Sequence, residues 1–280
     1  MKSYMVFTKF RLSALVIVSA LSGYLFVGEF DWLDMTYLLV GGLLVTAASN
    51  GSNQIWEREL DKKMKRTAKR PLPQGHMTVN EAYYVVVICL VAGTALLNLL
   101  NLYCAILGLA AFISYVFIYT PMKRKSPWAV FIGAFPGAIP PMLGVVAHDD
   151  IGFGVIAGVL FFVQFTWQFP HFWAIAWVSF DDYKAGGFSL LPSKKGKSKD
   201  SAFQIVAYSL ALIPFSLLPW LLDYTGIWSM LFATFFGGWF FLYAYKLFLT
   251  CEDKDARRLM FASFFYLPII QFVYVFDRII

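Results

Sequence analysis

Three oxygen-bearing side chains recur at every fourth position between two strongly apolar regions of the sequence: Asn53, Glu57 and Asp61. On a helix, residues four apart are turned by about 40° and raised by about 6 Å, so the three side chains form one stripe. Seven basic residues lie within and after this run: Arg58, Lys62, Lys63, Lys65, Arg66, Lys69 and Arg70. Carboxylates suited to a divalent cation therefore stand beside bases suited to an anion.

This run suits Mg²⁺ bridged to a diphosphate. The three side chains would fill part of the coordination shell with hard oxygen ligands, and phosphate oxygens would complete it. Charge-assisted hydrogen bonds from three of the bases are expected to hold the diphosphate: Arg66, Lys69 and Arg70. The alternative is that the charges form ion pairs on a solvated loop, while the bases only set the orientation in the membrane. That alternative is favoured for the bases nearest Asp61, namely Lys62, Lys63 and Lys65.

A second polar stripe lies in residues 162–187, which read FVQFTWQFPHFWAIAWVSFDDYKAGG. Gln164, Gln168 and His171 are spaced by four and three, so they share one face of a helix otherwise rich in Phe and Trp. Polar groups at such depth in a membrane are costly unless partnered, so they face a cavity or another helix. For His171, a hydrogen bond between helices and a contact with substrate are both open. Pro170 is expected to free a backbone carbonyl and to bend the helix.

Asp181 and Asp182 follow this segment directly. Like Glu57 and Asp61, they are expected at or just beyond a helix C-terminus, where the dipole disfavours negative charge by up to about 1 kcal/mol. A bound cation would relieve that cost, so the pair is predicted to supply further metal ligands. The alternative is a solvated pair of acids at a helix end.

The elements that position these residues are predicted to be transmembrane helices. Of the 280 residues, 59% are hydrophobic and 14% are charged, and the mean hydropathy is +0.65. This composition excludes an ordinary soluble globular protein. The apolar segments have helical length and lack the alternation of a β-barrel strand. We therefore predict an all-α polytopic membrane protein, a single domain over 1–280, with nine transmembrane helices near 12–28, 36–53, 82–100, 102–119, 128–147, 152–177, 203–222, 226–249 and 259–276.

Basic residues sort to one side of this predicted bundle. With the N-terminus in the cytoplasm, 22 of the 23 Lys and Arg residues fall on cytoplasmic segments, and only Arg278 falls outside. The positive-inside rule then predicts a plasma-membrane protein with a cytoplasmic N-terminus and an external C-terminus. The two acidic loops, 54–81 and 178–202, are both cytoplasmic and four spans apart, so any internal repeat is parallel. Because topology accounts for the net charge of +6, no nucleic-acid partner is expected.

Several motifs together resemble a known family. An N-x-x-x-E-x-x-x-D run after the second span precedes KRTAKRPLP, and WQFPHFWAIAW precedes DDYKAGG after the sixth. Over nearly the whole chain this combination is similar to the heme O synthases (protoheme IX farnesyltransferases), a branch of the UbiA superfamily of intramembrane prenyltransferases. The first motif is specific only to the superfamily. The WQFPHFW block followed by DDY points to the heme branch.

This resemblance implies a UbiA-type helical bundle in which farnesyl diphosphate is bound through Mg²⁺. The catalytic, metal-binding residues that it implies are Asn53, Glu57, Asp61, Asp181 and Asp182. The residues themselves, apart from the resemblance, predict substrate binding by Arg66, Lys69, Arg70, Gln164, Gln168, His171 and Tyr183. Ionisation would give a farnesyl cation, which a vinyl group of protoheme (heme B) would attack before water is added. A downstream heme-modifying enzyme or an oxidase-assembly protein would receive the product, heme O.

Three positions depart from the pattern of the superfamily. Glu57 replaces the more frequent Asp, which lengthens the ligand arm and keeps its charge. Ala185 stands where many relatives complete a D-x-x-x-D motif, so Asp181 and Asp182 must serve together, and which of them binds the metal is open. Phe10 replaces an expected Pro, which concerns only the local path of the chain.

Two other functions were weighed against heme farnesylation. A related enzyme would prenylate an aromatic acid, such as 4-hydroxybenzoate or a naphthoate, at the same metal site, but a small acceptor does not need the long WQFPHFW block. A secondary transporter would use intramembrane polar residues as an ion path. In this sequence the charged residues cluster at one membrane face instead. Heme farnesylation is therefore the leading hypothesis.

Overall fold

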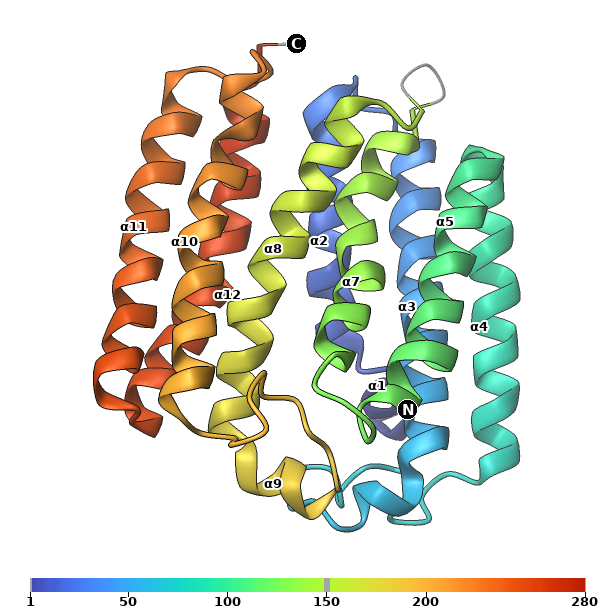
Figure 1. Ribbon diagram of the computed structural model, residues 1–280. Helices are drawn as coiled ribbons and strands as arrows, with labels where there is room; N and C mark the ends of the chain where they lie inside the picture. Colours follow the sequence, from blue (N-terminus) through green and yellow to red (C-terminus); the bar gives the residue numbers. More distant parts are fainter. Residues whose placement is uncertain (1, 149–151, 280) are drawn as a thin grey trace.

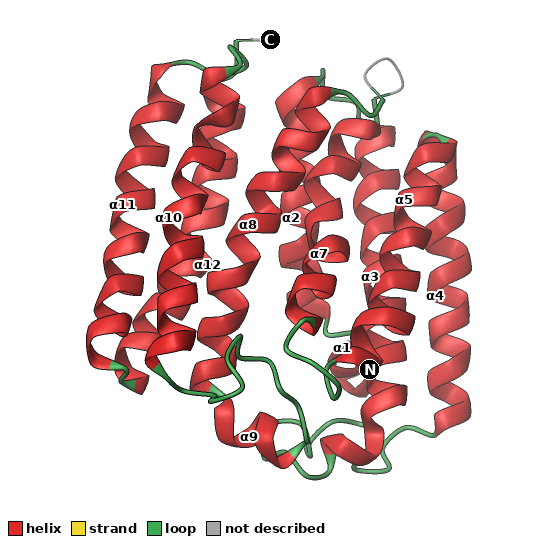
Figure 2. Cartoon of the chain, in the orientation of Figure 1, coloured by secondary structure: helices red, strands yellow, loops and turns green. Residues whose placement is uncertain are grey.

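Helices form the regular secondary structure of residues 2–148 and 152–279, the part of the chain that this computed structural model describes. Figure 2 shows helices and loops, with no strand among the described residues. The predicted all-α class is confirmed. In chain order the elements are α1 (Lys2–Phe7), α2 (Phe10–Val27), α3 (Trp32–Asp61), α4 (Val79–Leu100), α5 (Leu102–Ile113), η1 (Ser114–Tyr119), α6 (Thr120–Met122), α7 (Ala129–Val146), α8 (Val155–Val178), α9 (Phe180–Ala185), α10 (Lys199–Leu221), α11 (Ile227–Thr250) and α12 (Asp253–Phe276).

Within the described residues, eight helices are long and apolar enough to cross a membrane. One of them is continuous and comprises α5, η1 and α6 (Leu102–Met122). The other seven are α3, α4, α7, α8, α10, α11 and α12. These helices match the predicted spans from 36–53 onward. The remaining predicted span, 12–28, coincides with α2, whose described apolar stretch is the shorter Val16–Val27. The polytopic membrane class is confirmed, and the count of nine spans stays a prediction.

The long helices run side by side in one bundle, and α9 and several connecting loops gather at one end (Figure 1). The N-terminus lies towards this end, and the C-terminus lies at the opposite end. The central helix α8 packs against α7, α10 and α12, while α2 packs against α3, α7 and α12. Termini at opposite ends agree with an odd number of membrane crossings.

The helix that carries the first acidic stripe is longer than predicted. It runs from Trp32 to Asp61 rather than over 36–53, so the prediction that a loop begins at residue 54 is wrong. The charged run resembles a loop in hydropathy, but two of its acids, Glu57 and Asp61, are buried inside the protein rather than solvated. Because α3 continues to Asp61, the whole stripe is built on one rigid helix.

A π-helical turn, η1, lies between α5 and α6, just before the residues that approach the acidic stripe of α3. The N–H and the hydroxyl of Thr120 both donate to the carbonyl of Tyr115, the hydroxyl at 2.8 Å. This i→i+5 bonding inserts extra backbone into a helix, and such turns are frequent at functional sites. Here the turn delivers Thr120, and then Lys123, to the acidic stripe of α3.

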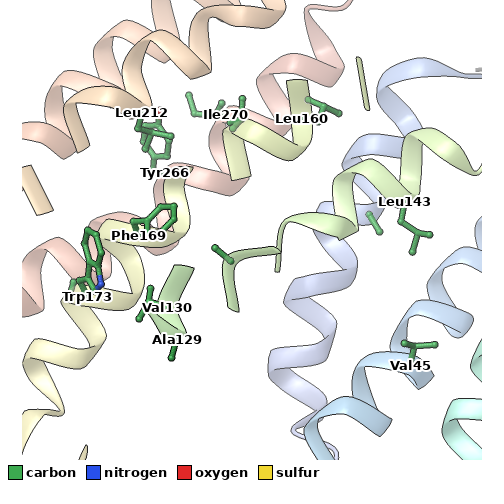
Figure 3. Close-up of a cluster of buried hydrophobic side chains, with 14 of the residues drawn as sticks. Val45, Ala129, Val130, Leu143, Leu160, Phe169, Trp173, Leu212, Tyr266 and Ile270 are labelled. Carbon is green, nitrogen blue, oxygen red and sulfur yellow. The ribbon is translucent and has the colours of Figure 1, made fainter. Parts of the chain in front are cut away.

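Large aromatic side chains fill the core beside α8. Phe169 and Trp173 are buried, and Figure 3 shows them near Val130 of α7. At another interface α2 and α7 approach closely because Gly144 lacks a side chain. A Cβ there would lie 2.0 Å from the carbonyl oxygen of Ala20. Tight packing of this kind supports helix association in lipid, where apolar burial alone gives little driving force.

Candidate active site

The three side chains of the first stripe are buried on one face of α3, as their spacing predicted. Asn53, Glu57 and Asp61 are exposed by only 2%, 5% and 0%. Asn53 Nδ2 donates a hydrogen bond to Thr120 Oγ1 at 3.2 Å, so this face is turned towards the segment after η1. Buried carboxylates are costly unless they are paired, and each of the two acids has a cationic partner.

Glu57 forms an ion pair with Lys123, and both side chains are at least nine-tenths buried. The Lys123 ammonium also lies over the rings of Tyr119 and Phe188, 5.0 and 5.4 Å from their centres. Burial lowers the pKa of Lys123, and the Glu57 carboxylate opposes that shift by favouring the charged form. An anion that took the place of Glu57 would stabilise the ammonium in the same way.

Asp61 forms a two-pronged ion pair with Arg70. Arg70 Nη1 lies 2.9 and 2.7 Å from the two carboxylate oxygens. The hydroxyl of Thr67 donates to the backbone carbonyl of Asp61 at 3.1 Å. The segment that follows α3 therefore folds back over the end of the helix and brings one of its bases to the stripe.

Asp182 connects the two acidic motifs. Its carboxylate oxygens accept hydrogen bonds from the backbone N–H groups of Lys65 and Arg66 at 3.2 and 3.1 Å. The side chain of Asp181 is exposed and makes no hydrogen bond or ion pair with other described residues. The structure therefore brings Asp182, and not Asp181, against the segment that follows α3.

The acid pair lies just beyond a helix C-terminus, as expected, but it also begins a second helix that was not expected. α8 ends at Val178, and Asp181 and Asp182 lie in the first turn of the separate helix α9. There the helix dipole favours negative charge instead of disfavouring it. The N–H donors from the segment after α3 add to this stabilisation, so Asp182 is held in place without a cationic side chain.

The predicted diphosphate-binding bases differ in their placement. Arg70 is bound to Asp61, whereas the guanidinium of Arg66 lies 5.9 Å from the centre of the Tyr183 ring. Burial raises the pKa of Tyr183, and the charge of Arg66 opposes that shift. Lys69 is exposed and forms no ion pair within the described part of the chain. All of these bases lie at the same end of the bundle.

Two lysines at this site were missed as functional residues. Lys9 and Lys123 were used only to indicate membrane orientation, yet Lys123 pairs with Glu57 of the stripe and Lys9 is close enough to be affected by the charge of Glu57. Burial, and then the nearby charges of Arg70 and Lys123, lower the pKa of Lys9 to about 7. Neither lysine belongs to one of the two acidic motifs, and the available signals were a position at the cytoplasmic end of a predicted span and, for Lys9, the neighbouring Phe10 where the superfamily has Pro.

A cavity of about 470 Å³ opens beside the stripe. Its walls include Glu57 of α3, Thr120 and Arg124 after η1, and Gly187 and Phe188 after α9. An acid, a base and an aromatic ring thus border one space. That combination suits a ligand with a charged head group and an apolar tail.

The donor set at this end of the bundle fits Mg²⁺ in chemical kind. Amide and carboxylate oxygens are the hard ligands that this ion prefers, and three of them lie buried on one helix face. Among the described residues, no three acidic, His or Cys side chains are gathered closely enough to form a metal site. The two acids of the stripe are instead paired with Arg70 and Lys123. A diphosphate would compete for the same two cations.

Neighbouring helices hold the two glutamines of the α8 stripe. Gln164 Nε2 donates to the carbonyl of Gly137 in α7 at 2.6 Å. That carbonyl has no helical N–H partner, because the residue four positions later is Pro141. Gln164 Oε1 accepts from Gln271 Nε2 of α12 at 2.8 Å, and Gln168 Nε2 donates to another α7 carbonyl at 3.0 Å. The cost of these buried amides is therefore met inside the bundle.

His171 also has a partner on another helix. Its Nδ1 lies 2.6 Å from Ser263 Oγ of α12, and its ring stacks on Trp167 with the centres 4.3 Å apart. Of the two alternatives that the sequence left open for His171, the hydrogen bond between helices is present. The substrate-binding roles of His171, Gln164 and Gln168 stay predictions.

A membrane bundle with acids and bases gathered at one end is the architecture expected of an intramembrane prenyltransferase, and comparison with known proteins agrees. The family model described as the UbiA prenyltransferase family matches residues 16–267. This chain belongs to the UbiA prenyltransferase family.

Two relatives point to a particular branch of that family. The chain is 48% identical to the protoheme IX farnesyltransferase of Cytophaga hutchinsonii, over 99% of this chain and 98% of that protein. It is 44% identical to the protoheme IX farnesyltransferase of Flavobacterium psychrophilum, over 97% of this chain and 92% of that protein. The resemblance that the motifs indicated is confirmed.

Solved structures share the same fold. A structure of digeranylgeranylglyceryl phosphate synthase matches with a TM-score of 0.82 and 22% identity, covering 99% of this chain and 97% of that one. A UbiA homolog from Archaeoglobus fulgidus bound to GPP and Mg²⁺ matches with a TM-score of 0.68 and 14% identity, covering 98% and 99%. At these identities the likeness shows the UbiA-type bundle alone, and the predicted fold is confirmed.

Proposed function

We propose that this protein transfers a farnesyl group from farnesyl diphosphate to a vinyl group of protoheme, with addition of water, giving heme O and diphosphate. The observation that carries the proposal is the 48% identity, over nearly the whole of both chains, to a protein named protoheme IX farnesyltransferase. The site supports the donor half of the reaction, because buried acids and bases meet beside a cavity at one end of the bundle.

The donor is proposed to bind as a complex with Mg²⁺. Oxygen ligands would come from the α3 stripe and from the acid pair of α9, that is from Asn53, Glu57, Asp61, Asp181 and Asp182. When bound, Mg²⁺ supplies charge neutralisation for the departing diphosphate. Support comes from the kind of oxygen that all five residues carry, from the burial of the three on α3 and from a related structure solved with GPP and Mg²⁺.

Lys123 and Arg70 are proposed to pass from the carboxylates to the phosphate oxygens when the donor binds. In the structure each neutralises one buried acid, and the exchange keeps every buried charge paired. Arg66 and Lys69, at the same end of the bundle, would add charge-assisted hydrogen bonds to the diphosphate. These donors stabilise the negative charge that develops on the leaving group as the carbon–oxygen bond breaks.

The acceptor half of the reaction is proposed to take place next to aromatic side chains. The bond between the allylic carbon and the diphosphate oxygen breaks, and its electron pair leaves with the diphosphate. The π electrons of the protoheme vinyl group form the new carbon–carbon bond. Water then adds its oxygen to the resulting cation and loses a proton to solvent. Aromatic faces stabilise the cation, and Tyr183, Gln164, Gln168 and His171 are proposed substrate contacts, with His171 on the heme side.

The whole chain, 1–280, is proposed to be one integral-membrane prenyltransferase domain of the cell membrane. Its acidic end and N-terminus would be cytoplasmic and its C-terminus external, which the sorting of 22 of 23 basic residues supports. Both the acceptor and the product are apolar enough to stay within the membrane. A downstream heme-modifying enzyme or an oxidase-assembly protein is proposed to receive heme O there.

One assay tests this function. Purified protein is supplied with protoheme, farnesyl diphosphate and Mg²⁺, and mass spectrometry follows the heme. The expected product is heavier than protoheme by one farnesyl group plus one water. Prenylation of 4-hydroxybenzoate or a naphthoate in place of heme would assign the protein to the aromatic-acid branch. Absence of any prenylated product would contradict prenyl transfer itself.

A further inference from the structure

The segment before the first long helix is fastened to α3 beside the acidic stripe. Gln54 Nε2 donates to the carbonyl of Phe7 at 2.5 Å, and Asn50 Nδ2 donates to Ser13 Oγ at 3.2 Å. The Phe7 ring is fully buried against Gly51, where an added Cβ would lie 2.8 Å from the ring. One face of α3 therefore holds the turn between α1 and α2, while the adjacent face carries the acids.

Lys9 occupies an unusual position in this turn. It precedes α2 in the left-handed conformation, with a φ of 49°. For a residue with a Cβ this conformation costs roughly 1–2 kcal/mol, so the surrounding contacts must fix it. The turn is held against positions 50, 51 and 54 of α3, beside Asn53 and Glu57, so Lys9 lies next to the acidic stripe. The charges of Arg70, Lys123, Glu57 and Arg66 act on its ammonium there.

The charges around Lys9 are unbalanced. Lys123 is paired with Glu57, and Arg70 is paired with Asp61. No carboxylate forms an ion pair with Lys9 among the residues that the structure describes. Taking a cation out of water without a counterion is unfavourable. Within this part of the chain Lys9 thus lacks a carboxylate partner of its own, and a bound anion would supply the counterion that favours its charged form.

Gln54 is the residue that connects this cation to α3. Its side chain is completely buried, and its Oε1 atom has no hydrogen-bond partner among the described residues. A buried amide with an unpaired oxygen is a cost to stability, while its N–H group serves the carbonyl two residues before Lys9. The main contribution of the Gln54 side chain is therefore the hydrogen bond that holds the turn.

We propose that Lys9 binds the diphosphate of the prenyl donor, and that Gln54 positions it by holding the turn between α1 and α2. This inference rests on the proposed function, in which the site takes a prenyl diphosphate. It assigns a part of the donor site to the segment before the first long helix, outside both acidic motifs. Lys9 would touch the ligand, whereas Gln54 would act only through the turn.

The test measures binding rather than turnover. The full chain in detergent is titrated calorimetrically with farnesyl thiolodiphosphate, a sulfur-bridged analogue that resists ionisation, in the presence of Mg²⁺. Lys9→Gln is expected to weaken binding about tenfold, the loss of one charge-assisted hydrogen bond. Lys9→Arg keeps the charge and is expected to stay within about threefold of the parent protein. The matched control is Lys62→Gln, which removes an exposed lysine paired with Glu59 and is expected to change nothing.

The role of Gln54 is tested in the same titration with a double-mutant cycle. Gln54→Leu is expected to weaken binding, and adding Lys9→Gln to it is expected to cost clearly less than Lys9→Gln alone. Strict additivity would overturn the positioning role. A cooperative thermal unfolding transition shows that each variant is folded. If Lys9→Gln is destabilised, the affinity of the charge-conserving variant Lys9→Arg, compared with that of the parent protein, still tests whether a cation at position 9 is sufficient for binding.

Two failures can be told apart. Unchanged affinity in Lys9→Gln, while the parent protein binds the analogue, would overturn the role of Lys9 and leave the proposed function intact. If the folded parent protein does not bind the analogue with Mg²⁺ at all, the proposed function itself is overturned.

Discussion

The acidic end of the bundle and the polar stripe of α8 are both buried and polar, but their partners differ in kind. Glu57 and Asp61 are paired with the side-chain cations of Lys123 and Arg70. Gln164 and Gln168 are instead bonded to backbone carbonyls of α7. A side-chain cation can move to a competing anion, whereas a backbone carbonyl is fixed by its helix. The first region is therefore suited to the proposed exchange of partners, and the second is suited to holding helices together.

The largest expected effect comes from removing the two acids of the stripe. Glu57→Gln and Asp61→Asn, singly or together, keep the side-chain shape but lose the charge that would bind Mg²⁺. Turnover is expected to fall on the order of a hundredfold to a thousandfold, as for loss of one preorganised electrostatic group. The measurement is heme O formation by mass spectrometry, with gel filtration to check folding.

Glu59→Gln is the matched control for these variants. Glu59 is an acid of the same helix, but it is exposed and paired with Lys62. Its replacement is expected to leave turnover unchanged. If Glu57→Gln and Asp61→Asn were both as active as Glu59→Gln, the metal-site argument would be lost.

A smaller effect should separate the two acids of α9. Asp182 accepts two backbone hydrogen bonds from the segment after α3, whereas Asp181 is exposed. Asp182→Asn is expected to lower kcat/KM for farnesyl diphosphate about tenfold, in line with weakened hydrogen bonds to a charged group. Asp181→Asn is expected to have less effect. Steady-state kinetics with both variants decide the matter, and a larger loss in Asp181→Asn would reverse the assignment.

His171 tests whether the α8 stripe has a chemical role beyond packing. His171→Ala is expected to raise the KM for protoheme several-fold more than the Kd for the farnesyl thiolodiphosphate analogue. Ser263→Ala removes the hydroxyl on α12 that partners His171, together with its bond to the Met260 carbonyl, and leaves the imidazole in place; it is the matched control. If both variants weakened the two ligands equally, the histidine would serve the bundle and not the heme.

The smallest expected effect on donor binding comes from Gln164, whose hydrogen bonds hold helices together. Gln164→Leu removes the hydrogen bonds to Gly137 and Gln271. The expected cost is about 1 kcal/mol, the scale of hydrogen bonds between membrane helices. Thermal unfolding in detergent measures it, with farnesyl diphosphate affinity expected to stay within about twofold of the parent protein. A large loss of donor affinity with unchanged stability would contradict the structural role of this residue.

The helices and the two stripes followed from the sequence because hydropathy and spacing are local properties. Asn53, Glu57 and Asp61 share a face on any helix, and the apolar segments have the length that a bilayer requires. The end of α3 was misjudged for a physical reason. A charged run is predicted to be a solvated loop unless the cations that pair with its acids inside the protein are known.

The partners themselves lay beyond prediction from local pattern. Lys123 reaches Glu57 through a π-helical turn, and Lys9 reaches the site through a turn held by Gln54. Asp182 is held by backbone N–H groups, which every residue except proline carries, so no side-chain motif marks them. The sequence partly indicated the acceptor of Gln164, the carbonyl of Gly137, because Pro141 leaves that carbonyl without a helical N–H partner. Its contact with α8 still required the fold.

The exchange of partners at the acidic end is the central claim, and Mg²⁺-dependent binding tests it most directly. The affinity for farnesyl thiolodiphosphate is measured by calorimetry with and without Mg²⁺, in the parent protein and in the Glu57→Gln, Asp61→Asn double variant. We predict that Mg²⁺ tightens binding to the parent protein at least about tenfold, the scale of one charge-assisted contact, and has little effect on the double variant. An equal response to Mg²⁺ in both proteins would contradict the account.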